Sequence, residues 1–148
     1  MDRWRDNTLS VAVLVLSSAT LKIAASLHPS ATGVGTHVQL GLPSCRFLAL
    51  TGIPCPSCGL TTSFAYAAHL DFRHALLASP FGLLLFFVVV SAIPTAIVFL
   101  WSRLSWQRVI AAPGVQTTTY MMIAAYLASW IYKIAATGNF HGLLLATR

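Results

Sequence analysis

Acidic residues are nearly absent from this sequence. Its 148 residues include three Asp or Glu against nine Lys or Arg, and only 8% are charged, whereas a soluble domain carries about 25%. Asp71 is the only acidic residue beyond the first six positions, which argues against a Ser-His-Asp catalytic triad. Because 57% of the residues are apolar, the chain cannot cover a water-facing surface. We therefore predict an all-α integral membrane protein.

Clusters of like charge are also missing. The basic residues are scattered and form no patch, which argues against nucleic acid as a partner. In a membrane protein an excess of Lys and Arg sets the topology and contacts anionic lipid. The expected partners are the lipid bilayer and other membrane proteins or further copies of this chain.

Apolar runs long enough to cross a bilayer, roughly 20 residues each, occur at residues 9–27, 81–101 and 117–136. Ser79 and Pro80 open the second run as an N-cap and a first-turn proline. Pro94 should kink this helix. Residues 1–148 thus form a single membrane domain with three transmembrane helices.

A cysteine-rich loop and short helices occupy residues 28–79 between the first two spans. We expect a short strand around residues 37–40 and a re-entrant or interfacial helix over residues 60–69. That helix is too short to cross at about 1.5 Å per residue. Asp71 is the expected N-cap of a further helix over residues 72–78.

The basic residues favour a cytoplasmic N-terminus by four to three. This orientation places the cysteine-rich turn on the periplasmic face of a bacterial inner membrane, with Arg3, Arg5, Arg103 and Arg108 inside and Arg46, Arg73 and Arg148 outside. Residues 1–27 have a competing interpretation as a cleaved signal peptide, but Lys22 interrupts the run, whose length exceeds about 7–15 residues. We expect a retained span.

Two lysines, Lys22 and Lys133, lie near the outer ends of the first and third spans. The preferred interpretation is that both anchor their helices at the membrane interface. The alternative is a cationic pair that faces the cysteine turn.

All three cysteines lie in one short stretch, as Cys45, Cys55 and Cys58. Prolines flank the second cysteine and a glycine follows the third, which indicates a specialised tight turn. Its expected structural residues are Gly52, Pro54, Pro56, Gly59 and Thr61. On an outer face, an odd number of cysteines gives one disulfide and one remaining thiol, and this structural role is the first interpretation.

Metal binding is the second interpretation. Tetrahedral zinc is bound by three thiolates and one histidine in many sites, and His37, His28 or His69 could complete such a set. Soft Cu(I) also suits three thiolates. Zinc or copper are thus the candidate cofactors, whereas an iron–sulfur cluster normally takes four thiolates.

Thiol–disulfide chemistry is the third interpretation. In a Cys-x-x-Cys pair at a helix N-terminus, the pKa of the first thiol is lowered, because the backbone N–H groups and the helix dipole favour the thiolate. Cys55 and Cys58 precede the expected helix 60–69 in this way. Cys55 would attack and Cys58 would resolve.

The run from Cys45 to Thr61, with Thr-Gly-x-Pro-Cys-Pro-x-Cys-Gly-x-Thr at its centre, resembles a family of small bacterial integral membrane proteins of unknown function. The likeness extends to Phe81 through Leu70-Asp71-Phe72, Ala75 and Ser79-Pro80. Thr62 stands where that family often has arginine. The resemblance implies the membrane fold and no reaction.

These observations favour an accessory or scaffold role in a membrane assembly over a free-standing enzyme. The chain is small, has few acidic groups and offers no convincing catalytic constellation. Metal binding through the three cysteines and thiol–disulfide exchange by Cys55 and Cys58 are the two alternatives.

Overall fold

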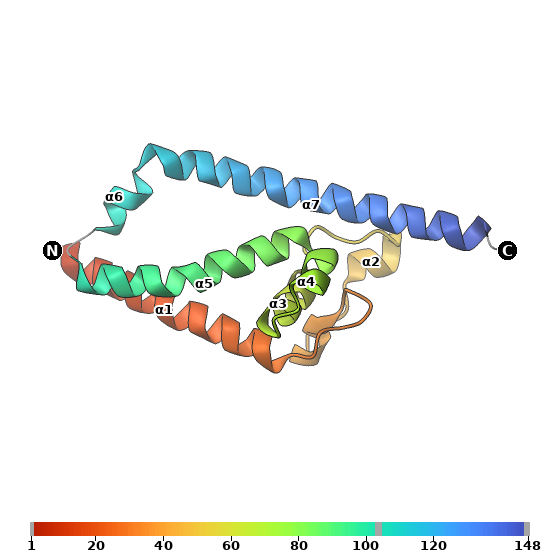
Figure 1. The fold of residues 1–148 in the computed structure, drawn as a ribbon, viewed down its shortest axis with the longest axis horizontal. Helices are drawn as coiled ribbons and strands as arrows, with labels where there is room; N and C mark the ends of the chain where they lie inside the picture. The colour runs from red at the N-terminus through yellow and green to blue at the C-terminus, as the bar shows by residue number, and fades with distance from the viewer. Residues whose placement is uncertain (1, 103–104, 147–148) are drawn as a thin grey trace.

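The computed structural model describes residues 2–102 and 105–146. Throughout these residues the regular elements are helical (Figure 1). They are α1 (Asp2–Ser26), η1 (Thr36–Leu40), α2 (Arg46–Thr51), α3 (Leu60–Ala68), α4 (Phe72–Ala78), α5 (Pro80–Trp101), α6 (Trp106–Ile110) and α7 (Pro113–Ala146). Arg103 and Arg148, which the charge count used, lie outside the described residues.

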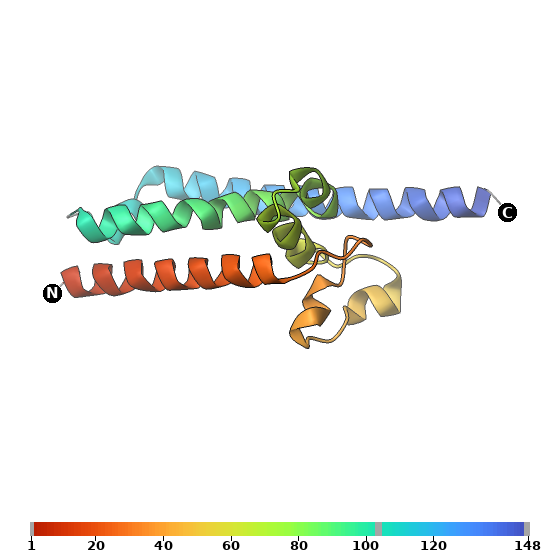
Figure 2. The ribbon, with the colours of Figure 1, turned by 60° about the horizontal axis from the view of Figure 1, so that its bottom comes forward.

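Three long helices run along one common axis, with α5 opposite in direction to α1 and α7 (Figures 1 and 2). Two stretches, Arg3–Ser26 and Pro80–Trp101, are long and apolar enough to cross a membrane. They contain most of the first and all of the second expected span. The third expected span lies within α7, which is not among the described helices that meet this test, so it stays a prediction.

The expected helix starts are confirmed at two places. Asp71 caps α4 by accepting from the His74 backbone N–H at 3.1 Å. Ser79 caps α5 through Oγ, which accepts from the Gly82 N–H at 3.2 Å, and Pro80 occupies the first helical turn. In both cases a short polar side chain satisfies a backbone donor that the first turn leaves without a partner.

The expected strand around residues 37–40 is wrong, because this segment is the 3₁₀-helix η1. Gly35 and Gly41 bracket it with φ of +89° and +76°, left-handed values that turn the chain at both ends. The buried Thr36 hydroxyl lies 2.8 Å from that of Thr62 on α3. This contact fixes the loop against α3 through the hydroxyl of Thr62.

The short helices pack into the end of the molecule where α1 ends and α5 begins (Figure 1). Their core consists of Ala24, Phe64, Ala67, Ala75 and Phe86. The two phenylalanine rings meet edge to face, with centroids 5.7 Å apart. Because α3 and α4 fill this end, the cysteine-rich loop is held against the helices.

A close approach of α3 to α5 depends on Gly82. A Cβ at this position would lie 2.7 Å from the Cβ of Ser63. The fully buried Ser63 hydroxyl lies 2.9 Å from the Ala75 carbonyl and 3.1 Å from that of Ser79. The glycine thus lets one hydroxyl connect α3 to the end of α4.

Candidate functional site

The three thiols converge. The Sγ atoms of Cys45, Cys55 and Cys58 all lie within 4.8 Å of one another. Cys45 is the N-cap of α2, whereas the other two belong to the turn that precedes α3. All three are free thiols, so the expected disulfide is not present. Cys55 and Cys58 are the closest pair, with sulfur atoms 2.9 Å apart, beyond the roughly 2.05 Å of a disulfide bond.

The turn around these thiols is closed by backbone bonds. The Cys58 N–H donates to the Cys55 carbonyl at 3.0 Å, and the Leu60 N–H donates to the Ser57 carbonyl at 3.1 Å. Gly59 has φ of +80°, and a Cβ there would lie 2.6 Å from the Ala78 oxygen and 2.9 Å from the Gly33 oxygen. Only glycine satisfies both the left-handed backbone and this close approach.

The environment separates the pKa values of the two neighbouring thiols. Partial burial raises the pKa of Cys55, but hydrogen bonds with Cys58, Ser57 and Cys45 outweigh burial and bring the pKa down to about 7. Burial raises the pKa of Cys58 to about 12, and its contacts with the other two thiols add to this effect. One thiol of the pair is thus readily ionised at neutral pH while the other keeps its proton.

Helix α7 also contacts the turn, through two of its side chains. The Trp130 indole N–H donates to the Pro54 carbonyl at 3.0 Å. The Lys133 ammonium donates to the Cys58 carbonyl. The preferred prediction of interface anchoring is therefore wrong for Lys133, whose side chain is only 7% exposed. Lys133 is buried against the turn, whereas Lys22 is exposed on α1.

A cavity of about 150 Å³ adjoins this contact. Its walls come from the loop before η1, the cysteine turn, the end of α4 and α7, and they include Thr32, Pro54, Cys58, Tyr132 and Lys133. Sequence reasoning missed Trp130 and Tyr132. The available signal was a lysine in an apolar run, closely preceded by two aromatic residues, Trp130 and Tyr132.

The histidines do not join the sulfur cluster. The group of metal-ligand atoms found at the turn within the described residues consists of the three thiols alone. His37 Nε2 lies 3.2 Å from the Pro43 carbonyl, and His69 Nε2 lies 3.1 Å from the Leu27 carbonyl. His28 is exposed, and its backbone N–H and carbonyl bond the Gln39 side chain.

The expected turn residues take distinct places. Gly52 ends α2 with φ of +68°, Pro54 is buried beneath Trp130, and Pro56 is half-buried. Thr61 lines a separate apolar cavity of about 230 Å³ between α1 and α3. Gly59 makes the close approach described above.

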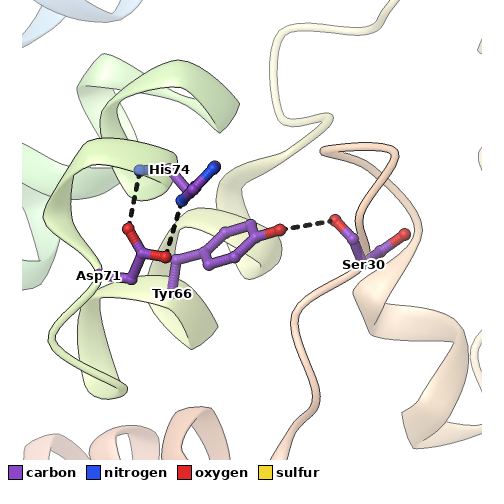
Figure 3. A network of polar contacts seen from close by, with 4 residues as sticks. All are labelled: Ser30, Tyr66, Asp71 and His74. Carbon is purple, nitrogen blue, oxygen red and sulfur yellow. Dashed lines mark hydrogen bonds and ion pairs between the residues drawn. The ribbon is translucent and has the colours of Figure 1, made fainter.

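A second polar cluster ties α4 to the loop (Figure 3). His74 Nδ1 lies 2.7 Å from Asp71 Oδ2, and the His74 ring stacks on Tyr66 with centroids 5.4 Å apart. The Tyr66 hydroxyl donates to the Ser30 carbonyl at 3.4 Å. The hydrogen bond from the His74 N–H lowers the pKa of Asp71, opposed by slight desolvation and aided by the imidazole. This cluster is a structural clamp that caps α4.

Residues 45–93 match a family model described as a protein of unknown function (DUF2752). The matched region begins at Cys45, contains all three cysteines and extends into α5. No curated protein and no solved structure matches the chain. The chain is therefore similar, over its cysteine turn and the helices that follow, to an uncharacterised protein family.

Proposed function

We propose that this chain is a membrane protein that binds one soft metal ion, zinc or copper(I), through Cys45, Cys55 and Cys58. The observation that carries the proposal is the convergence of the three Sγ atoms within 4.8 Å. Zinc–thiolate bonds of about 2.3 Å place tetrahedral sulfur atoms about 3.8 Å apart. The trio needs a small outward movement of the closest pair to reach this spacing.

The surroundings of the thiols favour a bound cation with thiolate ligands. Three thiolates and a divalent ion carry one net negative charge. The Lys133 ammonium lies on the Cys58 backbone and offsets that charge. Soft thiolate ligands select zinc and copper(I) over hard cations such as magnesium.

A membrane location is supported by the outer surface of the long helices. Large apolar side chains are exposed along all three, for example Leu16 on α1, Phe87 on α5 and Met121 on α7. Exposed apolar area on this scale is unusual for a soluble monomer. We place α1, α5 and the segment 117–136 of α7 across the bilayer, because their alternating directions suit three successive crossings (Figure 1).

The proposed orientation is the one that the count of basic residues favours, with the N-terminus in the cytoplasm. The cysteine turn lies at the end where α1 finishes and α5 starts (Figure 1), so a cytoplasmic N-terminus places the turn outside. Helix α1 packs along α5 and supplies Ala24 to the core, which favours a retained span over a cleaved signal. An accessory role beside other proteins of a bacterial inner membrane stays a prediction.

Metal content after anaerobic purification in mild detergent tests the proposal. We expect about one zinc or copper ion per chain, lost on replacing any one of Cys45, Cys55 or Cys58 by Ser. Ser91→Ala on α5, whose hydroxyl bonds Val88 within the helix, is the matched control and should keep the ion. Protein that stays metal-free after incubation with either ion, with all three thiols reduced, would refute metal binding.

Thiol–disulfide exchange is the second candidate, favoured by the 2.9 Å separation of Cys55 and Cys58 and by the Cys55 pKa of about 7. The Cys55 thiolate would attack a partner disulfide, forming a mixed disulfide and releasing one partner thiolate. Cys58, after losing its proton, would attack the Cys55 sulfur. This step forms the internal disulfide and releases the second partner thiolate, so two electrons pass to the partner.

Two substitutions separate the candidates. Cys45→Ser should abolish metal retention but leave exchange intact, because exchange needs only the other two thiols. Cys58→Ala should accumulate a mixed disulfide with a partner under exchange, visible by non-reducing electrophoresis. If the Cys45→Ser variant loses both metal retention and thiol–disulfide exchange, and the Cys58→Ala variant traps no mixed disulfide, metal binding is the better account.

A further inference from the structure

The cavity of about 150 Å³ beside the turn adjoins the proposed metal site, because Cys58 is among its lining residues. Cys58 belongs both to the thiol cluster and to the cavity wall. The neighbouring residues cover most of Cys58, which is only 6% exposed. An ion held by Cys58 would therefore be accessible from the cavity.

The cavity has a positive wall. Lys133 lines it, and the ammonium is fixed on the carbonyl of Cys58. Thr32 and Tyr132 add hydroxyl groups to the lining, and no carboxylate is among the described lining residues. Once an ion is bound, the Cys58 thiolate and the Lys133 ammonium both belong to this lining, and the ammonium favours an anionic over a cationic substituent on a ligand held there.

The thiol cluster supplies three ligand atoms from the described residues, whereas zinc is almost always four-coordinate in proteins. We propose that the cavity admits a small anionic thiolate, such as a cysteine side chain of a partner, which becomes the fourth ligand of the ion. This inference rests on the three-thiolate site proposed above.

The size of the cavity agrees with this ligand. A cavity of 150 Å³ holds a benzene-sized molecule, and a cysteine side chain or a small thiol is no larger. The apolar cavity between α1 and α3 is larger, but its lining contains no thiol. Of these two cavities, the one at Cys58 is thus the one that can deliver a ligand to the ion.

Cobalt(II) in place of zinc, added to the purified full chain, tests the inference. Mercaptoacetate, mercaptoethanol and cysteamine are titrated as anionic, neutral and cationic probes. Each probe loses its thiol proton to the buffer as it binds, so the probes are compared at equal concentrations of their thiolate forms. We expect an added thiolate-to-cobalt absorption band, with the mercaptoacetate thiolate binding about tenfold more tightly than that of cysteamine, which corresponds to about 1.4 kcal/mol. Bound cobalt is measured after desalting, because a thiol could also remove the ion.

Charge and volume variants sharpen the test. Lys133→Met should abolish the preference for the anionic thiol, and Lys133→Arg should keep it. Lys22→Met removes the same charge from an exposed position on α1 and should leave the titration unchanged. Val34→Trp, which places bulk in the cavity from the loop side, should weaken all three thiols.

The outcomes distinguish this inference from the proposed function. Unmodified protein that binds no cobalt would refute the three-thiolate site and the inference together. Protein that binds cobalt but shows no new band with any thiol would overturn only the inference. Release of cobalt without a preceding band, or an unchanged charge preference in a folded Lys133→Met protein, would also overturn it.

Discussion

A tryptophan indole donates a hydrogen bond at each end of this molecule, but to different kinds of acceptor. At the end far from the cysteines, Trp106 on α6 donates to the Ser10 hydroxyl on α1 at 2.8 Å and stacks on Phe99 of α5. At the cysteine end, Trp130 on α7 donates to the Pro54 carbonyl. The first contact joins helices through side chains, whereas the second fixes the backbone of a turn. The conformation of the cysteine turn therefore depends on α7.

The largest effect is expected where the turn touches its neighbours. Gly59→Ala should destabilise the protein by about 3 kcal/mol, because it adds a left-handed penalty and a clash with the Ala78 oxygen. Gly52→Ala is the control, since it has φ of +68° with nothing within 4 Å of the new Cβ, and should cost about 1–2 kcal/mol. Thermal unfolding in detergent measures both, and equal losses would contradict the close approach at Gly59.

Removing the cation at the turn should have the next largest effect. Lys133→Met leaves the Cys58 carbonyl without its charged donor and should cost about 2 kcal/mol. Lys22→Met, on the exposed face of α1, should change the stability by no more than about 0.5 kcal/mol. Denaturant unfolding compares the two, and a Lys133 variant as stable as the Lys22 variant would argue against the anchoring of α7 on the turn.

The two tryptophans test the comparison of the ends directly. Trp130→Phe and Trp106→Phe each remove one hydrogen bond and should each cost about 1 kcal/mol. Only the change at Trp130 should alter the rate at which Cys55 reacts with iodoacetamide. If Trp106→Phe alters that rate equally, the two ends are coupled and the turn does not depend on α7 alone.

Within the turn, the smallest effect is a difference in reactivity between neighbouring thiols. Metal-free, reduced protein should alkylate at Cys55 with a midpoint near pH 7, because raising the pH through this pKa converts the thiol to the reactive thiolate. Cys58, with a pKa of about 12, should resist alkylation across the same range. Mass spectrometry assigns the alkylated sites, and Cys55→Ser should remove the alkylation that rises near pH 7. A Cys55 alkylation midpoint near pH 9 would contradict the separated pKa values of the two thiols.

Much of the local structure could be predicted from residue type. Ser79-Pro80 and Asp71 mark helix starts because their side chains bond donors within the same turn. The sequence also indicates that Gly59 shapes a turn. The 3₁₀-helix at 36–40 could not be predicted in this way, because the Thr36–Thr62 contact that holds it joins residues far apart in the chain.

By itself, the sequence determined the apolar helices and the position of the cysteine turn between them, since both follow from composition and short-range patterns. Only the tertiary structure brought Cys45 next to Cys55 and Cys58, and only it placed Lys133 and Trp130 on the turn. The physical reason is separation along the chain. An isolated lysine in an apolar run is compatible with an interface anchor or a buried donor, and the packing of α7 decides which one forms.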